Sequence, residues 1–152
     1  MATNVLHSAQ AKSIGGRDGR IESTDHALTL ELTMPRTLGG RARAGATNPE
    51  QLFAAGYAAC FGNAITHLAR QAKVNVSELT VDAQVDLTQN EENLFTLVVA
   101  LRTSLPGASQ AQAEEIVAQA HHICPYSRAT HGNIVVTTTV TTHAEEPATP
   151  KL

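Results

Sequence analysis

The chain has 152 residues, of which 42% are hydrophobic and only five are aromatic, and its formal net charge is −3. That length and apolar content fit one domain with a real core and exclude a disordered or fibrous chain. The eleven Lys and Arg residues are scattered along the chain, so we expect no nucleic acid as a partner.

The first third of the chain has the pattern of β-strands, which we predict at residues 3–13, 19–24 and 27–33. The glycine-rich segment 15–19 supplies the turn between the first two strands. Residues 34–47 follow as a long loop that carries Arg41 and Arg43, and loops of this length are often lids.

A long helix is predicted from Pro49 to about residue 72, with either Thr47 or Asn48 as its N-cap and Glu50 in its first turn. Its first two-thirds are apolar on nearly all sides, which is typical of a helix in the middle of its fold. Three aromatic side chains recur at four-residue spacing and flank Cys60: Phe53, Tyr57 and Phe61.

The second half predicts strands at 79–88 and 94–103 joined by a hairpin, then a helix capped by Ser109 and stopped by Pro125, and a last strand at 132–142. This order is an α+β pattern in a single domain over residues 1–142. The segment from 143 to 152 has no apolar period, so we expect a flexible tail. A Rossmann fold is disfavoured because the glycine-rich segment precedes a strand.

Residues 1–8 have neither a basic region nor an apolar run of signal-peptide length, so we expect a cytoplasmic protein. The longest uncharged stretch, 51–66, is too short and too rich in Ala and Gly to span a bilayer, so no membrane is expected as a partner. In a reducing compartment the two cysteines, Cys60 and Cys124, are more often catalytic or inert than structural.

Cys60 lies mid-helix among apolar residues, where burial raises the pKa of a thiol and leaves it unreactive. A catalytic role therefore needs a nearby cation, and Arg17, in the glycine-rich turn, is the best candidate. The alternative is a buried, purely structural cysteine.

Cys124 closes the second helix at the negative end of its dipole, which disfavours a thiolate and suits a resolving thiol rather than an attacking one. The alternative is an apolar helix cap. Zinc binding by His121, His122 and Cys124 is disfavoured because adjacent histidines point roughly 100° apart on a helix, so no metal is expected.

Glu50 by default compensates the helix dipole. Ten residues of helix, about 15 Å, separate it from Cys60, so the two cannot touch within one straight helix. If Glu50 serves the thiol, it acts through a long side chain such as that of Arg17, or it comes from a partner subunit.

Residues 47–61 (TNPEQLFAAGYAACF) and 124–134 (CPYSRATHGNI) resemble the organic hydroperoxide resistance (Ohr) proteins of the OsmC/Ohr family. The resemblance covers essentially the whole chain, because the segments 15–19 and 38–40 also fall where that family places them.

The resemblance implies an OsmC/Ohr-like fold, with antiparallel sheets around a long buried central helix, in an intertwined homodimer. It implies a peroxidase without a cofactor, in which Cys60 attacks an organic hydroperoxide, Cys124 resolves the sulfenic acid, and a dihydrolipoyl group or lipoylated protein reduces the disulfide. Arg17 and Glu50 would then polarise Cys60. The aromatic stripe of Phe53, Tyr57 and Phe61 would bind the substrate tail, with plain core packing as the alternative.

The sequence departs from the family pattern at His131, where arginine is usual, and at Arg41 and Arg43, in a loop that is usually near neutral. These departures concern substrate range and the behaviour of the loop. Two other functions stay open: an OsmC-branch peroxidase with a different peroxide preference, and a thiol redox sensor or binding protein without catalytic turnover.

Overall fold

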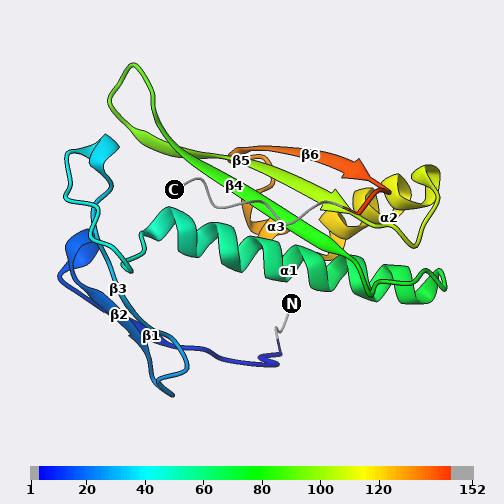
Figure 1. The fold of residues 1–152 in the computed structure, drawn as a ribbon, viewed down its shortest axis with the longest axis horizontal. Helices are drawn as coiled ribbons and strands as arrows, with labels where there is room; N and C mark the ends of the chain where they lie inside the picture. Colours follow the sequence, from blue (N-terminus) through cyan, green and yellow to red (C-terminus); the bar gives the residue numbers. More distant parts are fainter. Residues whose placement is uncertain (1–3, 145–152) are drawn as a thin grey trace. The chain divides into compact units, whose positions relative to one another are not determined.

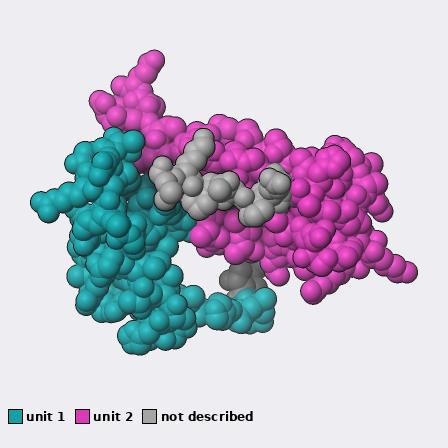
Figure 2. All heavy atoms as spheres, viewed as in Figure 1, with its two compact units in different colours: residues 1–52 teal, residues 53–152 magenta. Residues whose placement is uncertain are grey.

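The computed structural model describes residues 4–144 and has the predicted α+β composition (Figure 1). The chain divides into two compact units, residues 1–52 and 53–152 (Figure 2). The single domain predicted over residues 1–142 stays a prediction. Of the predicted tail, residues 145–152 lie outside the described part of the chain. The elements in order are β1 Ala11–Ile14, η1 Gly16–Asp18, β2 Arg20–Ser23, β3 Thr29–Glu31, η2 Arg36–Leu38, α1 Pro49–Gln71, β4 Thr80–Gln89, β5 Phe95–Ser104, α2 Gln110–Ile123, α3 Pro125–Thr130 and β6 Val135–Thr141.

The first unit contains an antiparallel sheet in the order β1-β2-β3. All three predicted strands exist but are shorter than expected, because the alternating pattern extends beyond the residues that find a partner strand. Their connection requires glycine at two positions. Gly15 has φ 79°, and a Cβ on Gly19 would lie 1.8 Å from the carbonyl oxygen of Ile14.

The long loop after β3 is fastened to the residues that directly follow that strand. The Arg43 guanidinium donates to the carbonyl oxygen of Leu32 at 2.8 Å, and the Arg43 backbone N–H donates to the Thr33 hydroxyl at 3.1 Å. The loop also contains the short helix η2. The departure at Arg43 therefore has a structural use, because it fastens a segment for which the sequence predicts only an irregular lid.

Helix α1 begins and ends where the sequence predicts. The Asn48 side chain accepts a hydrogen bond from the backbone N–H of Gln51 at 2.9 Å, which identifies Asn48 as the N-cap. Within this single chain one face of α1 is buried, whereas Ala55, Ala59 and Asn63, on the face that the sequence also predicts to be covered, are exposed. Alanine suits either environment, so an alanine-rich face does not reveal whether it is covered.

The second unit packs α1 and α2 with the sheet β4-β5-β6 (Figure 1). Strands β4 and β5 form the predicted antiparallel hairpin, with Val85 opposite Val99. Strand β6 runs parallel to β5, with Leu101 opposite Thr138, and this corrects the prediction of purely antiparallel sheets. The parallel pairing follows from the helical connection, because α2 and α3 return the chain to the end of the sheet where β5 began.

Helix α2 has the predicted capping box, with reciprocal hydrogen bonds between Ser109 and Gln112. Pro125 stops α2 as predicted, but it also starts α3, a helix that the sequence analysis missed. Proline at the first helical position is a start signal as well as a stop signal. Cys124 is therefore both the C-cap of α2 and the N-cap of α3. Within residues 4–144, no helix combines the length and apolar character that crossing a membrane requires.

Candidate active site

The two cysteines of the chain lie side by side in the second unit. The Sγ atoms of Cys60, in α1, and Cys124, at the α2–α3 junction, are 3.5 Å apart and both thiols are free. Cys124 is completely buried, whereas Cys60 is partly exposed. A small movement would bring the sulfur atoms to the roughly 2 Å of a disulfide bond, so this pair can cycle between dithiol and disulfide.

The surroundings of Cys60 favour the neutral thiol. Burial is the main cause that raises the pKa of Cys60 above its ordinary value, and the neighbouring Cys124 raises it further. The backbone N–H of Tyr126 opposes them and lowers that pKa. This N–H belongs to the first turn of α3, a helix that is not predicted from the sequence, so its effect on Cys60 emerges only from the structure.

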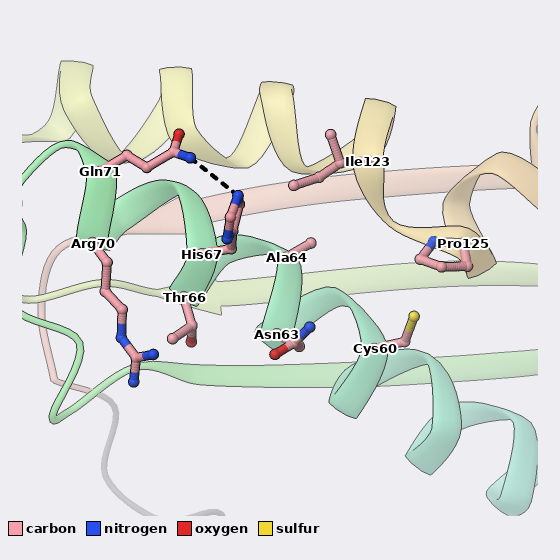
Figure 3. A pocket seen from close by; sticks show the side chains of 9 residues that line it. All are labelled: Cys60, Asn63, Ala64, Thr66, His67, Arg70, Gln71, Ile123 and Pro125. Carbon is pink, nitrogen blue, oxygen red and sulfur yellow. Dashed lines mark hydrogen bonds between the residues drawn. The ribbon is translucent and has the colours of Figure 1, made fainter. Parts of the chain in front are cut away.

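A cavity of about 460 Å³ opens beside Cys60 (Figure 3). Figure 3 shows the Cys60 and Arg70 side chains at opposite ends of the lining, and His67 and Gln71 joined by a hydrogen bond of 3.1 Å. The lining combines apolar groups at the Cys60 end with polar groups further along α1. Its residues are Cys60, Asn63, Ala64, Thr66, His67, Arg70, Gln71, Ile123 and Pro125.

The aromatic stripe lies against this site but not in the cavity. Phe53, Tyr57 and Phe61 form successive edge-to-face pairs, with ring centroids 6.0 and 6.4 Å apart. Tyr57 and Phe61 are fully buried in the core, so they support the helix that carries Cys60, and their role in substrate binding stays a prediction. Phe53 is only partly buried.

Gly56 explains how Tyr126, the residue whose N–H acts on Cys60, packs on α1. A Cβ at position 56 would lie 3.1 Å from the Tyr126 hydroxyl oxygen and 3.2 Å from its ring, closer than a Cβ normally approaches. Gly56 thus lets the first turn of α3 approach the turn of α1 that precedes Cys60.

Arg17 and Glu50 meet in the first unit. The Arg17 guanidinium donates two hydrogen bonds to the two carboxylate oxygens of Glu50, one of them 2.9 Å long. The bond to Arg17 lowers the pKa of Glu50 and raises that of Arg17. This contact agrees with the expectation that Glu50 acts through the long side chain of Arg17. Their role toward Cys60 stays a prediction.

His121, which the sequence raised as a possible zinc ligand, has hydroxyl partners in the structure. Both ring nitrogens of His121 contact hydroxyl groups, those of Ser127 at 3.0 Å and Thr138 at 2.9 Å. Burial lowers the pKa of His121. Among residues 4–144, no three His, Cys, Asp or Glu side chains gather as they would around a metal ion.

Comparison with known proteins supports the resemblance. Residues 40–139 match the family described as OsmC-like protein. The organic hydroperoxide resistance protein of Xanthomonas axonopodis pv. citri is 48% identical over 137 residues, which are 90% of this chain and 95% of that protein. The organic hydroperoxide resistance protein OhrA of Bacillus subtilis is 45% identical over 133 residues, 87% of this chain and 94% of the relative.

Solved structures agree with this result. The organic hydroperoxide resistance protein OsmC of Legionella pneumophila has a TM-score of 0.84 at 48% identity, covering 91% of this chain and 99% of that one. A putative organic hydroperoxide resistance protein of Vibrio cholerae, solved with captopril in one of its active sites, has a TM-score of 0.86 at 42% identity, with 95% and 99% coverage.

Proposed function

The chain belongs to the OsmC-like family, among the organic hydroperoxide resistance proteins, and from this premise we propose that it is a thiol peroxidase that reduces organic hydroperoxides to alcohols. The observation that carries the proposal is the pair of free thiols of Cys60 and Cys124, with their sulfur atoms 3.5 Å apart. Its biological role is peroxide detoxification.

The reaction has two chemical steps on the protein. The Cys60 thiolate attacks the terminal oxygen of the hydroperoxide, so that an S–O bond forms and the O–O bond breaks; the alkoxide leaves and takes up the proton that Cys60 released on ionising, which gives the alcohol. The Cys124 thiol then attacks the sulfenic sulfur of Cys60. The S–S bond forms, the S–O bond breaks, and hydroxide leaves with the thiol proton as water.

Cys60 attacks because it is partly exposed at the cavity, whereas Cys124 is fully buried with its sulfur 3.5 Å from that of Cys60. The apolar side chains at this end of the cavity, Ala64, Ile123 and Pro125, suit an alkyl hydroperoxide better than hydrogen peroxide. The proposal keeps Phe53, Tyr57 and Phe61 as the apolar wall on which the substrate tail binds.

Arg17 and Glu50 enter as the charged pair that favours the Cys60 thiolate. An arginine held by a carboxylate in a two-pronged contact keeps a fixed orientation and a permanent positive charge, which is what an ionising thiol needs. A dihydrolipoyl group or lipoylated protein is the proposed reductant, because a dithiol can reduce a disulfide completely in one encounter. We also propose that the protein is an intertwined homodimer and that it acts in the cytoplasm.

Steady-state consumption of tert-butyl hydroperoxide and of hydrogen peroxide, each with dihydrolipoamide, glutathione or thioredoxin as reductant, tests the proposal. We expect many turnovers with the organic peroxide and dihydrolipoamide. Preference for hydrogen peroxide would instead favour an OsmC-branch peroxidase. One equivalent consumed and no further turnover with any reductant would identify a redox sensor.

A further inference from the structure

A chain of hydroxyl groups joins the helices that carry the two cysteines. The Tyr57 hydroxyl, on α1, lies 3.0 Å from Ser127 Oγ and 3.2 Å from Thr130 Oγ1, both on α3. Ser127 Oγ in turn lies 3.0 Å from Nδ1 of His121, on α2. All three hydroxyl-bearing side chains are buried, so each needs its partners in place of water.

The positions of Tyr57 and Ser127 in the sequence place these hydroxyl groups next to the two thiols. Tyr57 lies three residues before Cys60 on α1, and Ser127 lies three residues after Cys124, the N-cap of α3. Residues three apart on a helix share a face. The Tyr57–Ser127 hydrogen bond and the Cys60–Cys124 contact are therefore two neighbouring links between the same two helices.

The hydrogen-bonding capacity of these groups allows one proton order. Thr130 Oγ1 donates its hydrogen to the carbonyl oxygens of Tyr126 and Ser127, which can only accept. Tyr57 must therefore donate to Thr130, and Ser127 must donate to Tyr57. Ser127 can then contact His121 only as an acceptor, so His121 carries its hydrogen on Nδ1.

The second ring nitrogen of His121, Nε2, fits the same order of donors and acceptors. With the hydrogen on Nδ1, its Nε2 is an acceptor, and Thr138 Oγ1, 2.9 Å away on β6, is the donor. Burial lowers the pKa of His121, which agrees with a neutral ring. The Phe61 ring, whose centroid is 4.5 Å from that of His121, packs against the imidazole from α1. The network thus anchors α3 to α1, α2 and β6 without any charged group.

On the basis of the proposed peroxidase function, we propose that His121, Ser127, Tyr57 and Thr130 are positioning residues for the resolving step, holding Cys124 against Cys60 in both redox states. None of these groups changes its bonding when the thiols react, so the helices keep their register while the S–O bond of the sulfenic acid breaks and the S–S bond forms. Disulfide closure then requires movement of the sulfur atoms rather than of the helices, and it competes well with further oxidation of Cys60.

The first test measures how strongly the fold favours the Cys60–Cys124 disulfide, by equilibration of the full-length protein with reduced and oxidised glutathione. We expect Ser127→Ala to lower this equilibrium constant about tenfold, because it breaks the link to both Tyr57 and His121. Thr130→Val should lower it about threefold, whereas Thr130→Ser, which keeps the hydroxyl, should restore the wild-type value.

Thr103→Val is the matched control, because it also removes a buried threonine hydroxyl, but one that has no hydrogen-bond partner among the described residues. It should leave the equilibrium constant unchanged. Values within twofold of wild type in both Ser127→Ala and Thr130→Val would overturn the proposal. Because no peroxide is used, this result is independent of whether the protein is a peroxidase.

The second test separates the two chemical steps after one equivalent of tert-butyl hydroperoxide, with dimedone present to trap sulfenic acid. In Ser127→Ala the ratio of trapped Cys60 to disulfide should rise about tenfold at a temperature well below unfolding. A merely structural role would lower the unfolding temperature and leave this ratio unchanged, and that outcome would contradict the proposal. If wild type consumes no peroxide, the proposed function fails while the glutathione result still stands.

The third test addresses the proton order itself. The ¹⁵N chemical shifts of the His121 ring distinguish a hydrogen on Nδ1 from one on Nε2. We expect the Nδ1–H form at neutral pH in wild type, and loss of that single form in Ser127→Ala. An Nε2–H ring in wild type would show that the hydroxyl chain does not run from His121 to Thr130.

Discussion

The two units of the molecule each hold one pair of reactive side chains. The surroundings of one pair favour its charged forms, whereas those of the other favour the uncharged form. In the first unit, Arg17 and Glu50 form a partly exposed ion pair in which each partner stabilises the charge of the other. In the second unit, the partly buried Cys60 faces the fully buried Cys124, and burial and the second thiol favour the uncharged form of Cys60.

This contrast explains why neither pair suffices for the proposed chemistry. The second unit supplies proximity, because the two sulfur atoms need little movement to bond. Of the groups that shift the pKa of Cys60, only the backbone N–H of Tyr126 lowers it. The proposed mechanism therefore requires the positive charge of the first unit to form the thiolate, and each prediction below tests one side of this division.

Cys60→Ser removes the nucleophile and should have the largest effect. A hydroxyl is far less nucleophilic than a thiolate toward an O–O bond, so peroxide consumption should fall by more than about 10³-fold. The assay is steady-state consumption of tert-butyl hydroperoxide with dihydrolipoamide. Thr103→Val controls for a change in the core, and residual turnover above roughly a tenth of wild type would rule out Cys60 as the attacking group.

Arg17→Ala tests whether the first unit activates the thiol of the second. We expect the pKa of Cys60 to rise and peroxide turnover to fall about 10²-fold. Arg17→Lys keeps the charge but loses the two-pronged contact with Glu50, so it should recover activity in part. Glu50→Gln should resemble Arg17→Lys more than Arg17→Ala.

The measurement is the pH dependence of Cys60 alkylation by iodoacetamide, with Cys124 replaced by serine in all four proteins. This background removes the second thiol, so that only Cys60 reacts. An unchanged pKa in Arg17→Ala would mean that Arg17 does not activate Cys60, and the comparison between the two units would lose its functional meaning.

The same division separates what the sequence could and could not predict. Helix α1, the hairpin β4–β5 and the capping box of Ser109 were predictable because they depend on local periodicity and end signals. The direction of β6 was not, because parallel pairing depends on how α2 and α3 return the chain. The sequence also did not decide which face of α1 is covered within one chain, since alanine is compatible with both environments.

At the candidate site, local reasoning identified both cysteines and the desolvation of Cys60, whereas contacts across the chain needed the structure. The two-pronged bond between Arg17 and Glu50 joins residues 33 positions apart, so local patterns do not reveal it, and the family resemblance was the signal that they act together. The Tyr57–Ser127 bond spans 70 positions. A signal for the second contact was present, because Pro125 after a possible cap is a helix start, but it was interpreted only as the end of α2.

Cys124→Ser sharpens the role of proximity in the second unit. Cys60 should still react once, but without the thiol 3.5 Å away its sulfenic acid should persist and oxidise further, so turnover should fall about tenfold. Intact mass after stoichiometric peroxide should increase by roughly 16 and 32 Da, for one and two oxygen atoms. A quantitative loss of about 2 Da would mean that another group resolves Cys60.

The smallest expected effect is the contribution of the Arg17–Glu50 pair to stability, and it tests the electrostatics of the first unit without any peroxide chemistry. Bonding to Arg17 lowers the pKa of Glu50 in the folded protein below its ordinary value. The pair therefore stabilises the fold at pH values above the unfolded pKa of about 4.3, and this stabilisation is lost as the pH falls through the lower, folded pKa. Because the side chains of Arg17 and Glu50 are 33% and 15% exposed, solvent screening limits the coupling to about 1 kcal/mol.

A double-mutant cycle of Arg17→Ala and Glu50→Gln, with free energies of unfolding from urea titrations at pH 7 and pH 3, isolates that coupling from other effects of the substitutions. We expect the coupling energy to be present at pH 7 and to decrease at pH 3. An equal coupling energy at both pH values would mean that packing rather than charge maintains the contact. The contrast between a charged pair in the first unit and an uncharged pair in the second unit would then not hold.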